Sequence, residues 1–399
     1  MIEWTPNVDK WIEVDIDAIS HNLQEIRRKM QAGTRLMAVV KANAYGLGAV
    51  SVTRELIKLG VDLFGVTFLS EAMQLRDNGV NEDILVFSPL LYEDYKTAIQ
   101  NDLSVTVGSA GDLDLVVKAA EQVGKKARIH IKVDTGLGRF GLAVGETLPV
   151  AREAHACEVI ILEGIFTHFA EATEDSYTIR QFESFRSLLE DLEQQGITIP
   201  LRHCCGSSAF LRHPHMHLDV VRIGTILYGQ FPAGKNIPDV SLKECYHFKA
   251  RITAIRHFNK GSYLGYYRTY RLPKDSRVAV IPVGLVDGFG VEAMPKPSGW
   301  IDLLKMGVKL AASFLNLNRT TLAAVIKKQR IYIRGKTFMQ FCLAEVPSGL
   351  EIQAGDVLEL PVKRTLASLA VPRFYLRGEQ YRADGFDPLV HRSPESTVE

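Results

Sequence analysis

The sequence predicts an α/β protein with an N-terminal (β/α)8, or TIM, barrel and a C-terminal domain made mostly of β-strands. Three observations support this prediction. Short apolar runs alternate with amphipathic stretches from about Ile16 to Gly229, β-type runs dominate beyond Gly229, and 399 residues are enough for two domains. A doubly wound open sheet is the alternative for the first half, but no Gly-x-Gly-x-x-Gly follows the first predicted strand.

Eight apolar runs in the first half have the length and composition of buried strands. They are Arg35–Val40, Leu63–Val66, Ile84–Phe87, Ser104–Val107, Ile129–Val133, Leu162–Phe166, Ile199–His203 and Asp219–Ile223. The segments between them carry apolar residues at helical spacing, most clearly Tyr177–Gln194. Eight strands with intervening helices fit the barrel.

The predicted barrel spans residues 12–235, and the C-terminal β domain combines residues 1–11 with 236–386. Ala233–Pro238 has the composition of a linker, and β-type runs follow it. They are Phe248–Ile255, Arg277–Val283, Arg330–Ile333, Thr337–Leu343, Val357–Leu360 and Arg373–Leu376. A helical insertion is expected near 298–325, where Trp300–Leu315 has one apolar face that predicts a core or interface helix. Residues 387–399 form a polar tail.

The bulk composition excludes several classes of partner. With 47 Lys+Arg against 46 Asp+Glu, the chain has no broad basic field for nucleic acid. No apolar run reaches the roughly 20 residues that span a bilayer, and the N-terminus does not resemble a signal peptide, so we expect no membrane partner and a cytoplasmic protein. Five irregularly spaced cysteines predict free thiols, and the proline-interrupted stretch His213–His217 predicts no metal site.

Lys41 is the most informative residue, because it directly follows an apolar strand and precedes small residues and Gly46-Leu47-Gly48. An amine at the end of a barrel strand can hold a pyridoxal phosphate cofactor, and barrel active sites lie at the C-terminal ends of the strands. Other polar residues follow later strands in the same way. They are Lys132, Asp134, Arg139, His168, Ser207, Ser208 and Arg222.

Three of these motifs resemble those of alanine racemases, which are two-domain pyridoxal phosphate enzymes of fold type III. They are Val39–Gly48, Lys132–Gly141 and Val221–Gly229, and the resemblance extends from Trp11 to about Arg382. It implies an isomerase that uses pyridoxal 5'-phosphate to interconvert L- and D-alanine, for D-alanine biosynthesis.

The resemblance also implies roles for individual residues. Lys41 would hold the cofactor and act as one acid/base, Arg139 and the backbone of Met339 would place the substrate carboxylate, and Lys132 matches a lysine that is carbamylated in some members. The other expected cofactor-binding residues are Tyr45, His168, Ser207, Arg222, Gly224, Thr225 and Tyr228. His168 would lie against the pyridine ring, and Arg222 would face the pyridine nitrogen.

Arg222 has a chemical meaning of its own, because arginine keeps its proton near neutral pH. Facing the pyridine nitrogen, it would leave that nitrogen unprotonated and make the ring a weaker electron sink, which favours racemisation over decarboxylation or transamination. The alternative is a surface arginine paired with Asp219.

Racemisation needs a second acid/base on the opposite face of the substrate. In the family a tyrosine of the partner subunit supplies it, which implies a homodimer. Spacing in the family points to Tyr266, and an arginine near this phenol would lower its pKa toward a working range. Tyr263 is the alternative.

The chain also departs from the family pattern. Leu285 and Leu369 stand where tyrosines are usual, Gln340 replaces an aspartate, and Gly206 replaces an asparagine. Alternative functions are therefore a racemase of a larger amino acid such as serine, lysine or ornithine, an amino-acid decarboxylase, and a degenerate pyridoxal-phosphate-binding protein.

Overall fold

The computed structural model describes residues 7–232, 239–292, 297, 299–314, 321–378 and 380–382. The predicted linker at Ala233–Pro238, parts of the predicted insertion and the tail at 387–399 lie outside these residues. The chain divides into two compact units, one formed by Ile16–Cys245 and the other by Met1–Asp15 together with Tyr246–Glu399.

The first unit contains eight parallel strands, as predicted. They are β2 (Arg35–Val39), β3 (Leu63–Val66), β4 (Asp83–Val86), β5 (Ser104–Val107), β6 (Ala127–Asp134), β8 (Ile160–Phe166), β9 (Leu201–His203) and β10 (Val220–Ile223), in the order β10-β2-β3-β4-β5-β6-β8-β9. Backbone hydrogen bonds from Asp219 N to Arg202 O (3.1 Å) and from Arg222 N to Cys205 O (2.9 Å) connect the two ends of this order. The prediction of a barrel is therefore confirmed.

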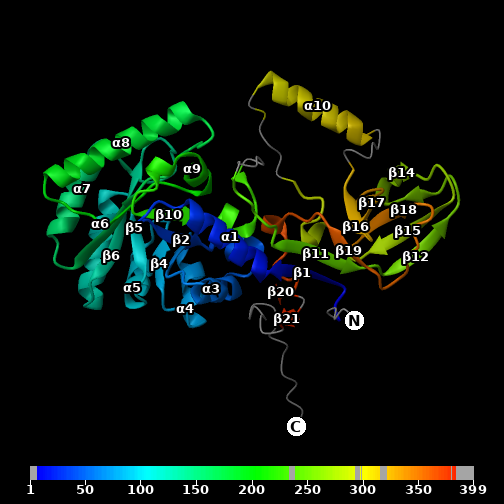
Figure 1. Ribbon diagram of the computed structural model, residues 1–399, viewed down its shortest axis with the longest axis horizontal. Coiled ribbons are helices and arrows are strands. Elements are labelled where there is room, and N and C mark those ends of the chain that lie inside the picture. The colour runs from blue at the N-terminus through cyan, green and yellow to red at the C-terminus, as the bar shows by residue number, and fades with distance from the viewer. Residues whose placement is uncertain are drawn as a thin grey trace, which may run out of the picture. The chain divides into compact units, whose positions relative to one another are not determined.

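Helices cover the outside of the strands (Figure 1). They are α1 (Ile16–Lys29), α3 (Ala49–Lys58), α4 (Leu69–Asp77), α5 (Tyr92–Gln100), α6 (Ala110–Val123), α7 (Val144–Ala156), α8 (Asp175–Gln194) and α9 (Ser207–Arg212). In α8 the apolar side chains at helical spacing, among them Phe185, Leu188 and Leu192, are buried. Each such side chain contributes about 1.5–3 kcal/mol of transfer free energy, which holds the helix on the sheet.

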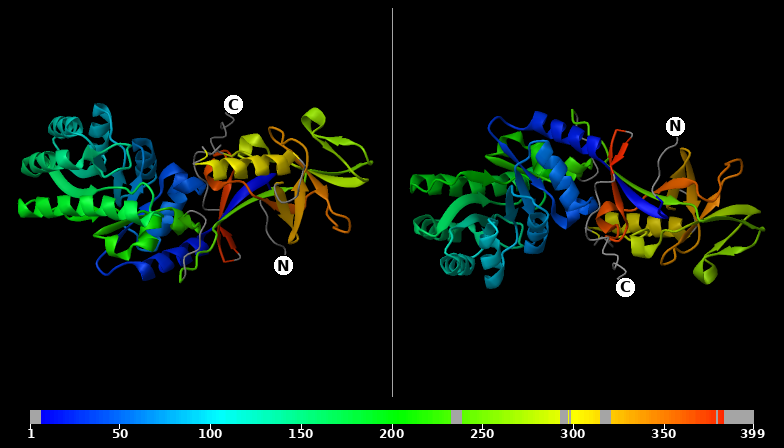
Figure 2. Two further views of the ribbon diagram at one scale, coloured as in Figure 1. Left: turned by 90° about the horizontal axis from the view of Figure 1, so that it is seen from above. Right: turned by 90° about the horizontal axis from the view of Figure 1, so that it is seen from below.

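The second unit is built on one ten-stranded sheet. Its N-terminal strand β1 (Lys10–Asp15) pairs antiparallel with β11 (Tyr246–Arg251) and parallel with β20 (Arg373–Arg377), and Figure 2 shows β1 in dark blue among the later strands. The remaining strands are β12 (Ala254–Phe258), β15 (Ser276–Ile281), β16 (Ala323–Ile326), β17 (Gln329–Ile333), β18 (Cys342–Val346), β19 (Val357–Leu360) and β21 (Gln380–Arg382). The prediction of a mostly β second domain is confirmed.

Two predicted strands of this unit were wrong in their bounds. The run Phe248–Ile255 is two strands, because β11 pairs with β19 whereas β12 pairs with β15. In Thr337–Leu343 only the last two residues belong to a strand, since Phe338 N donates to Phe341 O (2.9 Å) and closes a turn before β18.

The predicted insertion helix exists as α10 (Trp300–Phe314), but it is not a core helix of this chain. Trp300 is 86% exposed, Leu304 is 70% exposed and Phe314 is 85% exposed. The apolar spacing identified a helix correctly, yet none of the residues that the structure describes buries that face. Among the described helices, none is long and apolar enough to cross a membrane.

Candidate active site

The chain makes an unusual turn directly after Lys41. In α2 (Lys41–Gly46) the four residues Ala42–Tyr45 have φ between 50° and 56°, which is the left-handed region. Such a conformation costs a non-glycine residue about 1–2 kcal/mol, so the surroundings must hold it. Glu71 accepts the backbone N–H of Ala42 (2.6 Å), and Asn43 Oδ1 accepts the N–H of Ala49 (2.7 Å). The turn thereby fixes Lys41 at the C-terminal end of β2.

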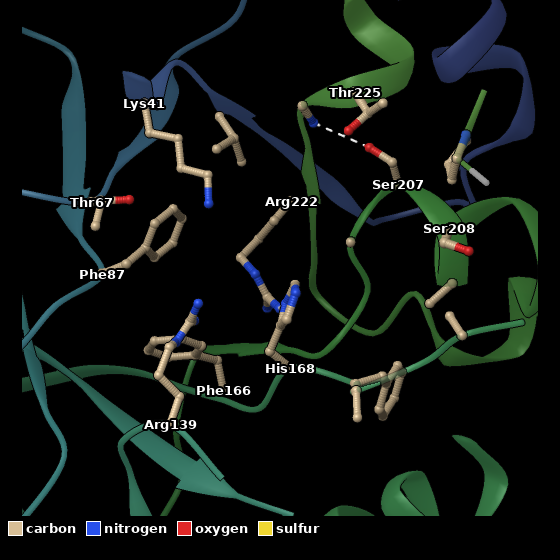
Figure 3. A pocket seen from close by; sticks show the side chains of 18 of the residues that line it. Lys41, Thr67, Phe87, Arg139, Phe166, His168, Ser207, Ser208, Arg222 and Thr225 are labelled. Carbon is tan, nitrogen blue, oxygen red and sulfur yellow. Dashed lines mark hydrogen bonds between the residues drawn. The ribbon is translucent and has the colours of Figure 1, made fainter. Parts of the chain in front are cut away.

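A cavity of about 620 Å³ opens at the C-terminal ends of the barrel strands. Eight of the predicted site residues line it, namely Lys41, Tyr45, Arg139, His168, Ser207, Arg222, Gly224 and Thr225. Figure 3 shows the side chains of Lys41, Arg139, Arg222 and His168 directed toward one space. The ionised side chains among the described lining residues are all cationic, with no carboxylate, so the cavity suits an anionic ligand.

The Lys41 amine is more reactive here than an exposed lysine. Burial lowers its pKa below the usual value, and the nearby Arg139 and Arg222 lower it further, while Glu71 opposes them. A lower pKa leaves more of the amine unprotonated and able to attack a carbonyl.

Neutral hydrogen-bonding groups gather at the side of the cavity formed by β10 and α9. Gly224 N donates to Ser207 Oγ (3.2 Å), and Thr225 lies next to them. A Cβ at position 224 would come within 2.4 Å of the Tyr45 hydroxyl, so only glycine lets that hydroxyl approach the backbone. Hydroxyls and backbone N–H groups of this kind can surround a phosphate.

Tyr228 lies behind this group instead of lining the cavity. Its ring is 1% exposed and packs 5.3 Å from the ring of Tyr45, and its hydroxyl donates to Val39 O (2.9 Å). Its predicted cofactor-binding role is therefore an indirect one, through the position of Tyr45.

Arg222 points into the barrel and donates to uncharged groups. Its guanidinium bonds His203 Nδ1 (2.8 Å) and His168 Nδ1 (3.1 Å), as well as two backbone carbonyls. Asp219 instead pairs with Arg202, through Nε at 2.7 Å, so the alternative of an Arg222–Asp219 surface pair is wrong. Burial and the surrounding cations lower the pKa of His168 to about 3, which keeps its imidazole neutral.

Lys132 is fully inside the protein, with 1% exposure, and its amine donates to Val133 O (2.6 Å). Burial lowers the pKa of Lys132 to about 7, with help from Arg222 and against the effect of Asp134. A large share of this amine is therefore unprotonated near neutral pH, which is the form that reacts with carbon dioxide.

The loop after β6 presents Arg139 to the cavity. The Asp134 carboxylate accepts the N–H groups of Gly136 (3.0 Å), Leu137 (2.8 Å) and Gly138 (2.9 Å), which closes the loop tightly. Arg139 itself is exposed, and its guanidinium lies 4.8 Å from the ring centre of Phe140.

The second unit carries the other predicted site residues on an exposed apolar surface. Tyr266 is 60% exposed and Met339 is 68% exposed, and the ring of Tyr266 packs 4.9 Å from that of Phe338, the neighbour of Met339. In the same segment Arg268 and Arg271 lie over the ring of Tyr263, each 5.7 Å from its centre.

Tyr267 has φ +61°, in the left-handed region. Glycine adopts such a φ without strain, whereas a tyrosine there has to be held by its surroundings.

Two residues that contact Arg222 or support it were not predicted from the sequence. His203 ends β9 and accepts from Arg222, and Phe166 stacks on His203 with ring centres 4.9 Å apart. The available signal was the position of His203 at a strand end, as for His168 after β8.

A barrel with a lysine of lowered pKa after its first strand, beside a cavity whose charged lining residues are all cationic, is the arrangement expected of a pyridoxal phosphate enzyme of fold type III. The models of the alanine racemase N-terminal and C-terminal domains match residues 14–232 and 245–370. The chain belongs to the alanine racemase family.

Relatives and solved structures agree with this assignment. "Alanine racemase 1" of Oceanobacillus iheyensis is 40% identical over 285 residues, which cover 70% of this chain and 76% of that protein. "Alanine racemase" of Methanococcus maripaludis is 34% identical over 368 residues, covering 91% and 92%. The structure is similar to that of alanine racemase of Clostridium difficile 630, with a TM-score of 0.85, 25% identity and coverage of 95% and 98% of the two chains. The same protein in complex with cycloserine gives a TM-score of 0.82 at 25% identity, with coverage of 95% and 98%.

Proposed function

We propose that this chain is a pyridoxal-phosphate-dependent racemase that interconverts L- and D-alanine, with Lys41 and Tyr266 as its two acid/base groups. The observation that carries the proposal is the cavity lined by three cations and no carboxylate, with a lysine amine of lowered pKa among them. The names of the relatives support alanine as the substrate.

The residues fit the cofactor at both ends. Lys41 would attach it, and Ser207, Thr225, Tyr45 and the backbone at Gly224 would bind its phosphate. When bound, the cofactor withdraws electrons from the substrate and acidifies the hydrogen on its α-carbon.

The protein's own groups then move protons and orient the substrate. Lys41 Nζ removes or returns the α-proton on one face, and the Tyr266 phenol does so on the other. Arg139 and the N–H of Met339 hold the substrate carboxylate. Lys132 as a carbamate would place a negative charge beside this site and would orient Arg139.

Arg222 decides which reaction is favoured. The Arg222 guanidinium can only donate hydrogen bonds, and the groups that accept them are uncharged. Arg222 therefore does not keep the ring nitrogen protonated in the way that a carboxylate would. The bound cofactor would then be a weaker electron sink, which favours return of the proton to the α-carbon over transamination.

The proposal extends to a homodimer in which Tyr266 enters the cavity of the partner subunit, and to a cytoplasmic enzyme that supplies D-alanine for cell-wall precursors. All five cysteines are free, four of them buried, which is consistent with a reducing compartment.

Two variants test the assignment of the acid/base pair. Lys41→Ala should abolish the visible absorbance of bound cofactor together with racemisation. Tyr266→Phe should keep that absorbance and lose at least about 100-fold in turnover, because general acid–base catalysis contributes about 10²–10⁴-fold. Tyr263→Phe is the matched control and should retain activity. An unchanged spectrum in the lysine variant, or full activity in Tyr266→Phe with loss in Tyr263→Phe, would overturn the assignment.

A further inference from the structure

Arg222 is a buried cation without an adjacent counter-ion. It is 5% exposed, and its hydrogen-bond partners are His203, His168 and the carbonyls of Thr167 and Cys204. Within the described residues it forms no ion pair. A buried charge is costly unless it is compensated, so the compensation has to come from further away.

A line of hydrogen bonds leads from Arg222 to a carboxylate. His203 Nε2 lies 2.9 Å from His130 Nδ1, and His130 Nε2 lies 3.2 Å from Glu163 Oε2. Both imidazoles are shielded from solvent, with exposures of 0% for His203 and 1% for His130. The line therefore connects Arg222 to Glu163 without contact with water at the two rings.

The direction of every bond in this line is fixed by Arg222. A guanidinium has no acceptor, so His203 Nδ1 must accept and the proton of its neutral ring must lie on Nε2. That N–H donates to His130 Nδ1, which places the proton of His130 on its own Nε2, where it donates to Glu163. Each imidazole is thus neutral, and the negative end of the line is Glu163.

Local structure at β8 makes room for this arrangement. A Cβ at position 164 would lie 2.1 Å from His130 Nδ1, so Gly164 is required by the imidazole. The pairing of β6 with β8 shifts at this point, from Ile129–Leu162 to His130–Gly164, which leaves Glu163 without a partner in the ladder. A β-bulge of this kind re-aims a side chain, here toward the line of histidines.

Glu163 is held as an anion at the opposite end of the strands. Ser104, the first residue of β5, donates to it (2.5 Å), and Arg128, the second residue of β6, pairs with it and with Asp83 (2.7 Å). Burial raises the pKa of Glu163, but hydrogen bonds from His130, Arg128 and Ser104 outweigh burial and lower its pKa below the usual value.

We infer that His130 and Glu163 are positioning residues, which act through His203 to hold Arg222 charged and oriented toward the pyridine nitrogen of the cofactor. The role assigned to Arg222 rests on the proposed function, whereas the line of hydrogen bonds does not. The arrangement stabilises a buried cation while its counter-charge stays away from the cavity. A carboxylate next to Arg222 would repel an anionic cofactor and could share a proton with the ring nitrogen.

The test combines a readout on the protein alone with a readout on the cofactor. In histidine-labelled apoprotein, ¹⁵N spectra should show His203, assigned by its loss in His203→Asn, protonated on Nε2 and not on Nδ1 at neutral pH. Glu163→Gln keeps an acceptor for His130 but removes the charge, and His130→Phe cuts the line with a ring of similar size. Each variant should weaken binding of pyridoxal phosphate to the folded apoprotein by about tenfold, which is typical of the loss of a residue that positions a binding residue.

Asp83→Asn is the matched control, because it makes the same carboxylate-to-amide change beside Arg128 but outside the line. It should bind the cofactor within about twofold of the native protein. The inference is overturned if His203 carries its proton on Nδ1 or on both nitrogens, or if Glu163→Gln and Asp83→Asn weaken binding equally. If the native apoprotein did not bind pyridoxal phosphate, the proposed function would fail. The tautomer of His203 would still test the line of hydrogen bonds from Arg222 to Glu163.

Discussion

At the scale of single residues, burial is the main cause of the shifted pKa values in the cavity and next to it. It lowers the pKa of Lys41, Lys132 and His168, and in each case neighbouring cations add to the effect. Because the charged lining residues share one sign, each disfavours the protonated form of the next. The surroundings thus favour the unprotonated forms of both amines and of the imidazole.

Lys132 provides a pH test of this environment. Its folded-state pKa of about 7 lies below the ordinary lysine value of 10.5, so between these values the unfolded chain binds more protons and stability rises with pH. The group contributes up to about 1.4 kcal/mol per pH unit in this window. Urea unfolding of native apoprotein and Lys132→Met, in carbon-dioxide-free buffer, should show the native protein gaining at least about 1 kcal/mol on the variant between pH 7 and 9. If the unfolding free energies of the native protein and of Lys132→Met changed equally with pH, the lowered pKa of Lys132 would be contradicted.

Most of the individual site residues could be predicted from the sequence, because polar residues that follow apolar strands collect at one end of a barrel. Lys41, Arg139, His168, Ser207 and Arg222 line one cavity as expected. The roles of the buried partners could not be predicted, because a histidine in a strand has the same sequence pattern whether it only packs or also relays a hydrogen bond. The side on which the arginines of the Tyr263–Arg271 segment lie also depends on a left-handed turn that residue types do not reveal.

At the scale of elements, the left-handed turn after β2 stores strain where Lys41 is attached. Ala42 is exposed and has φ 50°, so a larger side chain there would change mainly the conformational energy of the backbone and would not lose buried contacts. Ala42→Val should destabilise the protein by about 1–2 kcal/mol, because a β-branched residue avoids this region. Ala42→Gly should stay within about 0.5 kcal/mol of the native protein, since relief of strain offsets lost chain entropy. Equal stabilities of the valine and glycine variants in urea unfolding would exclude a strained turn.

The helices α8 and α10 have similar apolar spacing but different surroundings. Leu188 in α8 is 3% exposed, and Leu188→Ala should cost about 2–5 kcal/mol of unfolding free energy. Leu304 in α10 is 70% exposed, and Leu304→Ser should change it by no more than about 0.5 kcal/mol. Chemical denaturation of both variants decides the point, and a large loss in Leu304→Ser would show that α10 is buried in solution.

Periodicity therefore predicts that a helix forms, and the covering of its apolar face is a separate property. For α8 the neighbouring barrel elements supply that covering, whereas for α10 no described element does. The strand bounds follow the same logic, since β11 ends where its ladder partner changes from β19 to β15. Partner changes are long-range facts that a local pattern does not contain.

On the scale of the whole molecule, the two predicted acid/base groups belong to different compact units. Lys41 lies in the barrel, and Tyr266 lies on an exposed apolar surface of the β unit together with Met339. Exposed aromatic and apolar side chains next to the proposed second acid/base are the features expected of an interface that completes a site. The two-domain division and the barrel could be predicted from alternating patterns, but the origin of the second base came only from the resemblance to the family.

Complementation between two inactive variants tests this shared site most directly. Lys41→Ala and Tyr266→Phe should each be inactive alone. When equal amounts are mixed under conditions of subunit exchange, half of the dimers should be heterodimers, and each heterodimer should have one intact site. The mixture should then recover about a quarter of the native racemase activity, as random exchange in a twofold dimer requires. Demonstrated exchange without recovered activity would contradict an active site built from Lys41 of one chain and Tyr266 of another.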